Sequence, residues 1–289
     1  MRAEVISIGD ELTSGQRLDT NSQWLSLRLA DLGIRTLFHT TVADDLESNR
    51  VVFATACERA DIVVATGGLG PTADDLTRQS VANMMQVELE LHEPSLRHIE
   101  ERFSSRSRPM TESNRVQAMF PAGTQPIHNP HGTAPGILGQ HKTATFYCLP
   151  GVPAEMKEMW HESVEPSLIE ALGENRRVIW HKRLKCFGIG ESDLEQMLPD
   201  LIRRGLKPTV GITVSTATIT LRISAEGRDE LECRGAVAPT EATIRECLGE
   251  LIFGEGDDEL HDVVHRELQV AGKRLAVVER GTHGLIAGW

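Results

Sequence analysis

The chain has 289 residues, of which 40% are hydrophobic and 25% charged, and its formal net charge is −12. This length predicts more than one domain. The acidic balance argues against a duplex-binding protein, which needs a basic surface patch. No apolar run reaches membrane-spanning length, and the first residues pass directly into a strand, which leaves no room for a signal peptide. The five scattered cysteines lack a C-x-x-C pair and indicate reduced thiols. We therefore expect a cytoplasmic protein without membrane or nucleic-acid partners.

The first 85 residues predict three strand–helix repeats. We expect strands at 3–8, 34–42 and 61–65, and helices at 21–32, 46–59 and 76–85. This alternation is typical of an open, right-handed α/β sheet, in which ligands bind outside the carboxyl ends of the strands. An acidic pair follows each of the three strands: Asp10–Glu11, Asp44–Asp45 and Asp74–Asp75. We therefore expect these carboxylates to converge on one site.

The stretch from Thr66 to Thr77, between the third strand and its helix, carries three glycines. Glycine lets a backbone approach a bulky anion and adopt positive φ, and a helix N-terminus adds unpaired amides. Asp74 and Asp75 would repel a bare phosphate, but carboxylates suit a magnesium-like ion placed against it. Alternatively, the two aspartates only cap the helix. A cap does not explain the glycines, so we favour phosphate and metal binding.

The next segment predicts a charged surface helix at 94–105 and a loop at 106–109, whose basic residues we interpret as solvated. A long loop is expected from 126 to 139, then a strand at 143–149 and a helix from 153 towards 172. His128 and His131 lie in that loop without the spacing of metal ligands, so we expect polar loop contacts. The loops rich in Gly and Pro beside the strand indicate rigid walls around a pocket.

The composition changes around 173–177, where we expect a linker. The following order of elements is β-α-β-β-α-β. We expect strands at 178–187, 209–216, 217–225 and 251–254, one helix from 190 through 201, and a second helix that follows the third strand and ends near 248. This order predicts a small α+β, ferredoxin-like module that acts as scaffold or dimer contact. A helix at 259–270, a strand at 274–278 and the start of another helix then look like the opening of a further domain. We therefore divide the chain into residues 1–173, 174–256 and 257–289.

Several runs together resemble the CinA family. They are Gly9–Leu12, Gly15, Asp19–Asn21, Thr66–Thr77, Gly132–Gly136 and Leu149–Met156. The resemblance implies a molybdopterin-binding-like N-terminal α/β domain, the α+β middle module and a homodimer. In this family the N-terminal domain is associated with metal-dependent hydrolysis of ADP-ribose to AMP and ribose 5-phosphate. A separate C-terminal domain deamidates nicotinamide mononucleotide.

The resemblance also implies roles for single residues. Asp44 and Asp75 fall where related domains keep essential carboxylates, so we expect them to be catalytic and, with Asp74, to hold a divalent ion of the magnesium or cobalt type. Whether a monovalent cation assists stays open, as does the choice between a carboxylate and a metal-bound water as base or nucleophile. The nucleotide is expected to contact Asp10, Glu11, Asn21, Thr66, Gly67, Gly68, Gly70, Thr72, Thr133, Gly136, Gly151 and Glu155.

One stretch departs from the family. The deamidase domain opens with a motif like A-E-S-C-T-G-G, whose serine is the nucleophile, whereas residues 278–284 read V-E-R-G-T-H-G. Arg280 takes the nucleophile's place, and a guanidinium cannot be activated as a nucleophile. We therefore expect no deamidase activity. Two alternatives to the pyrophosphatase stay open: adenylyl transfer to a molybdopterin-like acceptor, and a non-catalytic nucleotide-binding protein.

Overall fold

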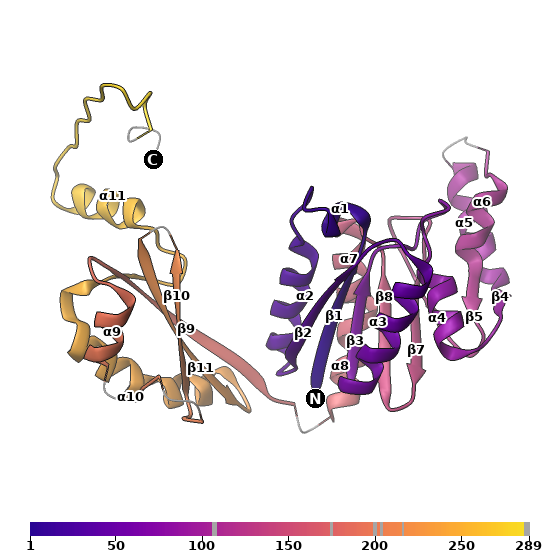
Figure 1. Cartoon of the computed structure of the whole chain (residues 1–289), viewed down its shortest axis with the longest axis horizontal. Helices are drawn as coiled ribbons and strands as arrows, with labels where there is room; N and C mark the ends of the chain where they lie inside the picture. Colours follow the sequence, from indigo (N-terminus) through magenta and orange to yellow (C-terminus); the bar gives the residue numbers. More distant parts are fainter. Residues whose placement is uncertain (106–108, 174–175, 199–200, 203–204, 216, 286–289) are drawn as a thin grey trace. The chain divides into compact units, whose positions relative to one another are not determined.

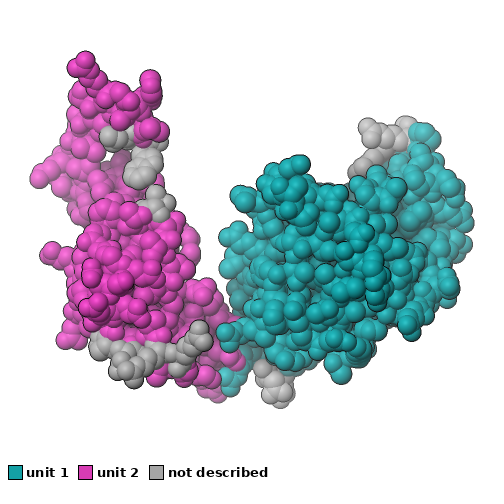
Figure 2. Space-filling model, viewed as in Figure 1, with its two compact units in different colours: residues 1–177 teal, residues 178–289 magenta. Residues whose placement is uncertain are grey.

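The computed structural model describes residues 1–105, 109–173, 176–198, 201–202, 205–215 and 217–285. It divides into two compact units, residues 1–177 and 178–289, which are coloured separately in Figure 2. Each unit has its own sheet and its own hydrophobic core. The three-part division of the chain, with a boundary at 257, stays a prediction. The basic loop residues 106–108 lie outside the described part of the chain.

Unit 1 is built on a six-stranded sheet in the order β2-β1-β3-β8-β7-β6 (Figure 1). The strands are β1 (Arg2–Ile8), β2 (Arg35–Val42), β3 (Ile62–Thr66), β6 (Gln125–Ile127), β7 (Gly136–His141) and β8 (Ala144–Leu149). The first four in spatial order run parallel, whereas β7 and β6 run antiparallel. The carboxyl ends of β1, β2, β3 and β8 therefore meet at one edge of the sheet, where the sequence predicts the ligand site.

Helices cover both faces of this sheet, because its strands are apolar on both sides. The helices are α1 (Asp10–Thr13), α2 (Thr20–Asp31), α3 (Leu46–Arg59), α4 (Thr77–Met85), α7 (Pro153–Met159) and α8 (Glu165–Leu172). Phe53 of α3 and Val81 of α4 pack into the core of one face. Leu29 of α2 and Trp160, in the π-helical turn Trp160–Val164 between α7 and α8, pack into the core of the other. The predicted α/β architecture is confirmed.

A small subdomain lies between α4 and β6. It contains β4 (Leu89–Leu91), α5 (Glu93–Ser105), α6 (Glu112–Arg115), the short 3₁₀ turn Val116–Ala118 and β5 (Met119–Pro121), and β4 pairs with β5. The predicted helix at 94–105 is present. Its face carrying Leu96 and Ile99 is buried against Ala118, so only the opposite side of this helix is a surface.

The predicted long loop from 126 to 139 is wrong at both ends, because β6 and β7 occupy part of it. Pro126 in β6 and Gly136 and Gly139 in β7 are residues typical of loops, so the sequence of these two strands does not show a strand pattern. Gly139 faces Phe146 across the strand pair, and a Cβ there would lie 2.3 Å from the Phe146 ring. The glycine therefore marks a place that a neighbouring ring fills, a tertiary feature invisible in the strand's own sequence.

Unit 2 contains the predicted β-α-β-β-α-β order. Its elements are β9 (Val178–Phe187), α9 (Glu191–Met197), β10 (Thr209–Ser215), β11 (Thr218–Gly227), α10 (Glu230–Leu248) and β12 (Ile252–Glu255). The strands lie in the order β10-β11-β9-β12, and all neighbours are antiparallel. The alternating apolar side of β11 packs against α10 through residues such as Leu221 and Val237. The small α+β module is confirmed.

Two predictions beyond this sheet are wrong. The first helix of the module ends at Met197 instead of reaching Leu201, because Pro199 disfavours helical geometry in the residue before it. After α11 (Leu260–Val270), residues 274–278 form no strand. Val278 is 98% exposed, and a strand needs a neighbour to pair with, which this stretch does not have among the described residues.

Among the described residues the cysteines form no disulfide, and most of them are buried. All five cysteines are free, four of them buried, and burial raises the pKa of Cys57 to about 12. In the described part of the chain, no helix combines the length and apolar character needed to cross a bilayer.

Candidate functional site at the strand ends of unit 1

A hollow of about 500 Å³ opens at the carboxyl edge of the sheet in unit 1. This volume is typical of pockets for small ligands. Its walls come from the glycine loop, from the segment around Thr133 and from the turn after β8, all of which the sequence singled out. Seven of the predicted site residues line it: Glu11, Gly68, Gly70, Asp75, Thr133, Gly151 and Glu155.

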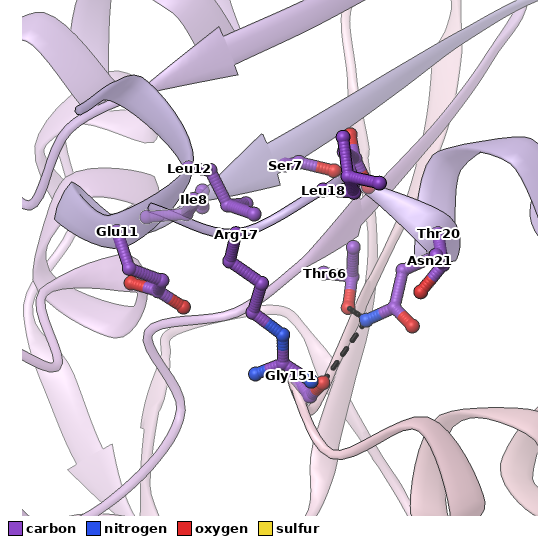
Figure 3. A pocket seen from close by; sticks show the side chains of 11 residues that line it. Ser7, Ile8, Glu11, Leu12, Arg17, Leu18, Thr20, Asn21, Thr66 and Gly151 are labelled. Atoms are coloured by element: carbon purple, nitrogen blue, oxygen red, sulfur yellow. Dashed lines mark hydrogen bonds between the residues drawn. The ribbon is translucent and has the colours of Figure 1, made fainter. Parts of the chain in front are cut away.

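A second, much smaller hollow of about 30 Å³ adjoins the first. The two hollows share Glu11, Arg17 and Gly151 (Figure 3). Here the Asn21 side-chain amide donates to Thr66 Oγ1 at 3.2 Å and to the Gly151 carbonyl at 3.0 Å. Thr66 Oγ1 in turn donates to the Pro150 carbonyl at 2.9 Å. Asn21 and Thr66 therefore fasten α2, β3 and the turn after β8 together at the floor of the site.

The glycine loop needs its first two glycines for packing. Gly67 and Gly68 have φ values of +113° and +63°, which favour glycine. A Cβ on Gly67 would lie 2.3 Å from the Ile8 carbonyl, and one on Gly68 would lie 2.4 Å from Thr77 Oγ1. The loop is thus pressed between the end of β1 and the start of α4.

Asp75 is built into this loop through both of its carboxylate oxygens. Its Oδ1 accepts from the Gly70 amide at 2.7 Å, and its Oδ2 accepts from the Thr72 amide at 2.8 Å and from the Thr72 hydroxyl. The capping alternative is wrong, because α4 begins at Thr77 with Leu76 as N-cap and has no side-chain cap. The amides of Gly70 and Thr72 are thus occupied, whereas those of Gly68 and Leu69 have no hydrogen bond within the described residues.

Arg78, which the sequence analysis did not single out, lies beneath the same loop. It is only 1% exposed and donates from Nη2 to the Leu69 carbonyl at 2.8 Å and from Nη1 to the Gly70 carbonyl at 3.4 Å. Burial lowers its pKa to about 10, against the opposing effect of Asp75. A cation in the first turn of a helix is unfavourable for the helix dipole. That misplaced charge is the signal in the sequence, and its partners in the structure are the Leu69 and Gly70 carbonyls and the nearby Asp75 carboxylate.

The predicted carboxylates of the first two strand ends meet directly. The Asp10 amide donates to Asp44 Oδ2 at 2.9 Å, and the Asp44 amide donates back to Asp10 Oδ1 at 3.0 Å. Burial raises the pKa of Asp44 above its ordinary value, and the neighbouring charges of Asp10, Asp74 and Glu11 raise it further, against the lowering effect of the Asp10 amide. We call these four carboxylates the acidic edge.

Asp45 has a different role from its neighbour. Its carboxylate caps α3 by accepting from the Ser48 amide at 2.8 Å, which lowers its pKa. Of the three acidic pairs predicted to converge, the structure joins Asp10 to Asp44 by hydrogen bonds and places Glu11 and Asp74 near enough to raise the pKa of Asp44. It engages Asp45 in a helix cap and Asp75 in the glycine loop.

The donor chemistry of the acidic edge fits a hard divalent cation, since every candidate ligand is a carboxylate oxygen. Asp44 and Asp74 would hold the ion. Among the described residues, however, no three His, Cys, Asp or Glu side chains lie close enough to form a protein-only metal cage. Magnesium commonly takes one or two carboxylates and completes its shell with water and substrate phosphates. The edge suits that kind of shared site.

The wall containing Thr133 is organised by Asn129. The Asn129 amide nitrogen donates to Glu155 Oε2 at 2.7 Å and to the Ala134 carbonyl at 2.9 Å, while its oxygen accepts from the Gly132 amide at 2.7 Å. Glu155 therefore fastens this wall as well as lining the hollow. His131 contributes a backbone contact with Asn129, as predicted for a loop residue.

Four predicted ligand residues line neither hollow: Asp10, whose contact with Asp44 is described above, and Gly136, Gly67 and Thr72. Gly136 is buried within β7, where a Cβ would lie 2.6 Å from the Cys148 carbonyl, so it serves sheet packing instead of lining the pocket. Gly67 packs beneath the loop, as described above. Thr72 contacts Asp75 from an exposed position.

Two lining residues were missed by the sequence analysis. Gln117 is only 1% exposed and its amide oxygen has no hydrogen-bond partner within the described residues, so it offers unused polar capacity at the wall. Arg17 lines both hollows and extends between Glu11 and Gly151 in Figure 3. Its signal in the sequence is a single basic residue between the Gly9–Leu12 and Asp19–Asn21 runs.

Family comparison defines the class of this site. A profile described as "Probable molybdopterin binding domain" matches residues 4–170, and one described as "Damage-inducible protein CinA KH domain" matches residues 181–254. Unit 1 is therefore a molybdopterin-binding-type α/β domain, and the sheet of unit 2 belongs to the second domain type.

Relatives match the chain over its whole length. It is 41% identical over 287 residues to a "CinA-like protein" from Dictyoglomus turgidum, a match covering 99% of this chain and 69% of the relative. It is 36% identical over 288 residues to a "Putative competence-damage inducible protein" from Bacillus subtilis, covering 100% and 69%. The crystal structure of CinA from Thermoplasma acidophilum, described as of unknown function, matches with 32% identity and a TM-score of 0.55 over 58% of this chain and 98% of that one. The chain belongs to the CinA family.

Proposed function

We propose that the chain is a divalent-metal-dependent hydrolase of a nucleotide-sugar pyrophosphate, with ADP-ribose as substrate and AMP and ribose 5-phosphate as products. The observation that carries this proposal is the position of the acidic edge beside a hollow of ligand size. Glu11 belongs to both, so a phosphate group in the hollow lies next to carboxylates that favour a cation. The family comparison supports an enzyme-related domain but names no reaction.

The chain's own residues bind the substrate from two sides. The amides of Gly68 and Leu69 make no hydrogen bond within the described residues, and these two residues line the hollow, so their amides would donate to an anion there. The turn 150–153 and the Thr133 wall enclose the remainder of the ligand. Asp44 and Asp74 would hold a divalent ion, which would neutralise the charge that develops on the phosphoryl oxygens.

Asp44 is the side chain best placed to accept a proton. In the absence of an ion its pKa is raised above that of an ordinary aspartate, which makes the carboxylate a stronger base. Water attacks one phosphorus, its proton passes to Asp44, and the bond from that phosphorus to the bridging oxygen breaks. The bridging oxygen leaves with the other phosphate, so one water is consumed and two monophosphates form.

The test is product analysis by chromatography of ADP-ribose incubated with pure protein plus magnesium, cobalt or a chelator. The proposal predicts AMP and ribose 5-phosphate in equal amounts, only when the divalent ion is present. If ADP-ribose binds but neither ion supports turnover, the chain is a non-catalytic nucleotide-binding protein.

Adenylyl transfer is the second candidate, since the profile that matches residues 4–170 is described as molybdopterin-binding. It predicts AMP transfer from ATP to a pterin acceptor and no water-dependent cleavage of ADP-ribose. Because Arg280 replaces the nucleophilic serine of the deamidase motif, we also predict that no nicotinate mononucleotide forms from nicotinamide mononucleotide.

A further inference from the structure

The charges that line the main hollow are unbalanced for an anionic ligand. Among the described residues, three carboxylates, Glu11, Asp75 and Glu155, face one cationic side chain, Arg17. Asp75 accepts hydrogen bonds from loop amides and Glu155 accepts one from Asn129, so both carboxylates are already engaged. Arg17 is the lining side chain whose charge is still available, because its guanidinium makes no ion pair or hydrogen bond with any described residue.

The glycine loop cannot by itself bind two phosphates. Asp75 occupies the amides of Gly70 and Thr72, which leaves those of Gly68 and Leu69 for a ligand. Two adjacent amides suit one phosphate group. A second phosphate of the same ligand needs another donor, and a planar guanidinium binds phosphate oxygens in a bidentate manner.

The position of Arg17 meets this need. It lines both the 500 Å³ hollow and the small hollow and therefore lies where they join, beside Gly151 (Figure 3). Its backbone is fixed there, because the Arg17 amide donates to the Glu11 carbonyl at 3.0 Å. The exposed side chain can thus reach a phosphate in the hollow that it lines.

We propose that Arg17 is the specificity-determining residue that makes this site select nucleoside diphosphates, and their esters, over nucleoside monophosphates. The loop amides bind the phosphate common to both classes, and Arg17 binds the phosphate that only diphosphates have. This inference rests on the proposed use of the hollow as a nucleotide site, and it names the substrate class by its second phosphate.

The experiment is calorimetric titration of the full chain with ADP and with AMP, in magnesium, for wild type and three variants. Arg17→Gln removes the cation, and Arg17→Lys keeps the charge without the planar fork. The matched control Arg97→Gln removes an equal charge from an exposed position on α5. Neither nucleotide is a substrate of the proposed hydrolysis, so this result does not depend on turnover.

We expect wild type and R97Q to bind ADP at least tenfold more tightly than AMP. R17Q should lose at least tenfold in affinity for ADP and less than threefold for AMP, and R17K should fall between. Equal losses for both nucleotides in R17Q, no loss in R17Q, or no preference for ADP in wild type would each overturn the proposal. A preference that depends on Arg17 alongside no cleavage of ADP-ribose would instead overturn only the hydrolase.

Discussion

The glycine loop and the acidic edge lie side by side and use the same residue type in opposite ways. In the loop, Asp75 has every carboxylate oxygen satisfied by loop donors, and Arg78 lies buried beneath it. At the edge, Asp44 faces Asp10, Asp74 and Glu11, and the repulsion contributes to its raised pKa. The hydrogen-bond acceptors of Asp75 are therefore satisfied within the loop, whereas the carboxylates of the acidic edge repel one another and would be stabilised by a bound cation.

This difference indicates separate roles for Asp44 and Asp75, the two predicted catalytic aspartates. A carboxylate whose partners are all present stabilises structure, and its loss is felt in folding. A carboxylate surrounded by like charges costs stability, and such strain is typical of functional sites. We therefore expect Asp75 to hold the loop in shape and Asp44 to take part in chemistry.

The largest effect should come from Asp44→Asn in the ADP-ribose assay. Loss of a proton acceptor and cation ligand is expected to lower turnover at least 10²-fold, the scale of general-base catalysis. The matched variant is Asp45→Asn, which removes the same charge one residue away, from the cap of α3. Steady-state kinetics should show near-normal turnover for D45N. Equal losses in both variants would remove Asp44 from the mechanism.

Asp75→Asn tests the structural role of the glycine loop, and we expect it to lower the stability of the fold. An amide presents a donor where the Gly70 and Thr72 amides already donate, so we expect a loss of about 1–3 kcal/mol in unfolding free energy. Denaturant titration measures it, with Asp74→Asn as the exposed neighbouring control. If D75N and D74N unfold at the same denaturant concentration, the loop does not depend on Asp75.

The smallest effect is the pH dependence of stability at Asp44. Because its folded pKa lies above its unfolded pKa, the folded protein loses stability as pH rises through that interval, and the ionised group is destabilising above it. Without divalent ions, D44N should therefore melt above wild type at neutral pH, and the difference should vanish below the unfolded pKa. The pKa of Asp45 is lowered, so D45N should melt below wild type at neutral pH. Thermal scans that show the same sign for both variants would contradict this assignment.

The sequence predicted the fold well, and it singled out the segments that meet around the hollow, because both depend on local patterns. β-branched runs mark β1 and β3, and a glycine cluster between strand and helix is typical of an anion-binding loop. The residue pattern alone did not separate Asp44 from Asp45, or Asp74 from Asp75, and only the family resemblance assigned them different roles. Identical neighbours differ in which backbone amide each one reaches, and that is visible only in the structure.

The residues that were missed depend on contacts between distant segments. Arg78 is informative only once it is seen beneath Leu69, and Arg17 only once the two hollows are seen to meet beside it. Gly136 was expected in the pocket because it belongs to a motif run, but sheet packing against Cys148 explains its presence. Motif membership therefore located the region of the site without separating ligand contacts from supporting residues.

The most direct test of this account is the affinity of Mn²⁺, as a paramagnetic substitute for magnesium, measured by electron paramagnetic resonance with and without ADP. Because the acidic edge is an incomplete cage, the account predicts weak Mn²⁺ binding to the chain alone. ADP should tighten it at least tenfold in wild type and D45N, and the gain should be lost in D44N. Equal Mn²⁺ affinity in wild type and D44N, with ADP present, would contradict the claim that the acidic edge holds the cation.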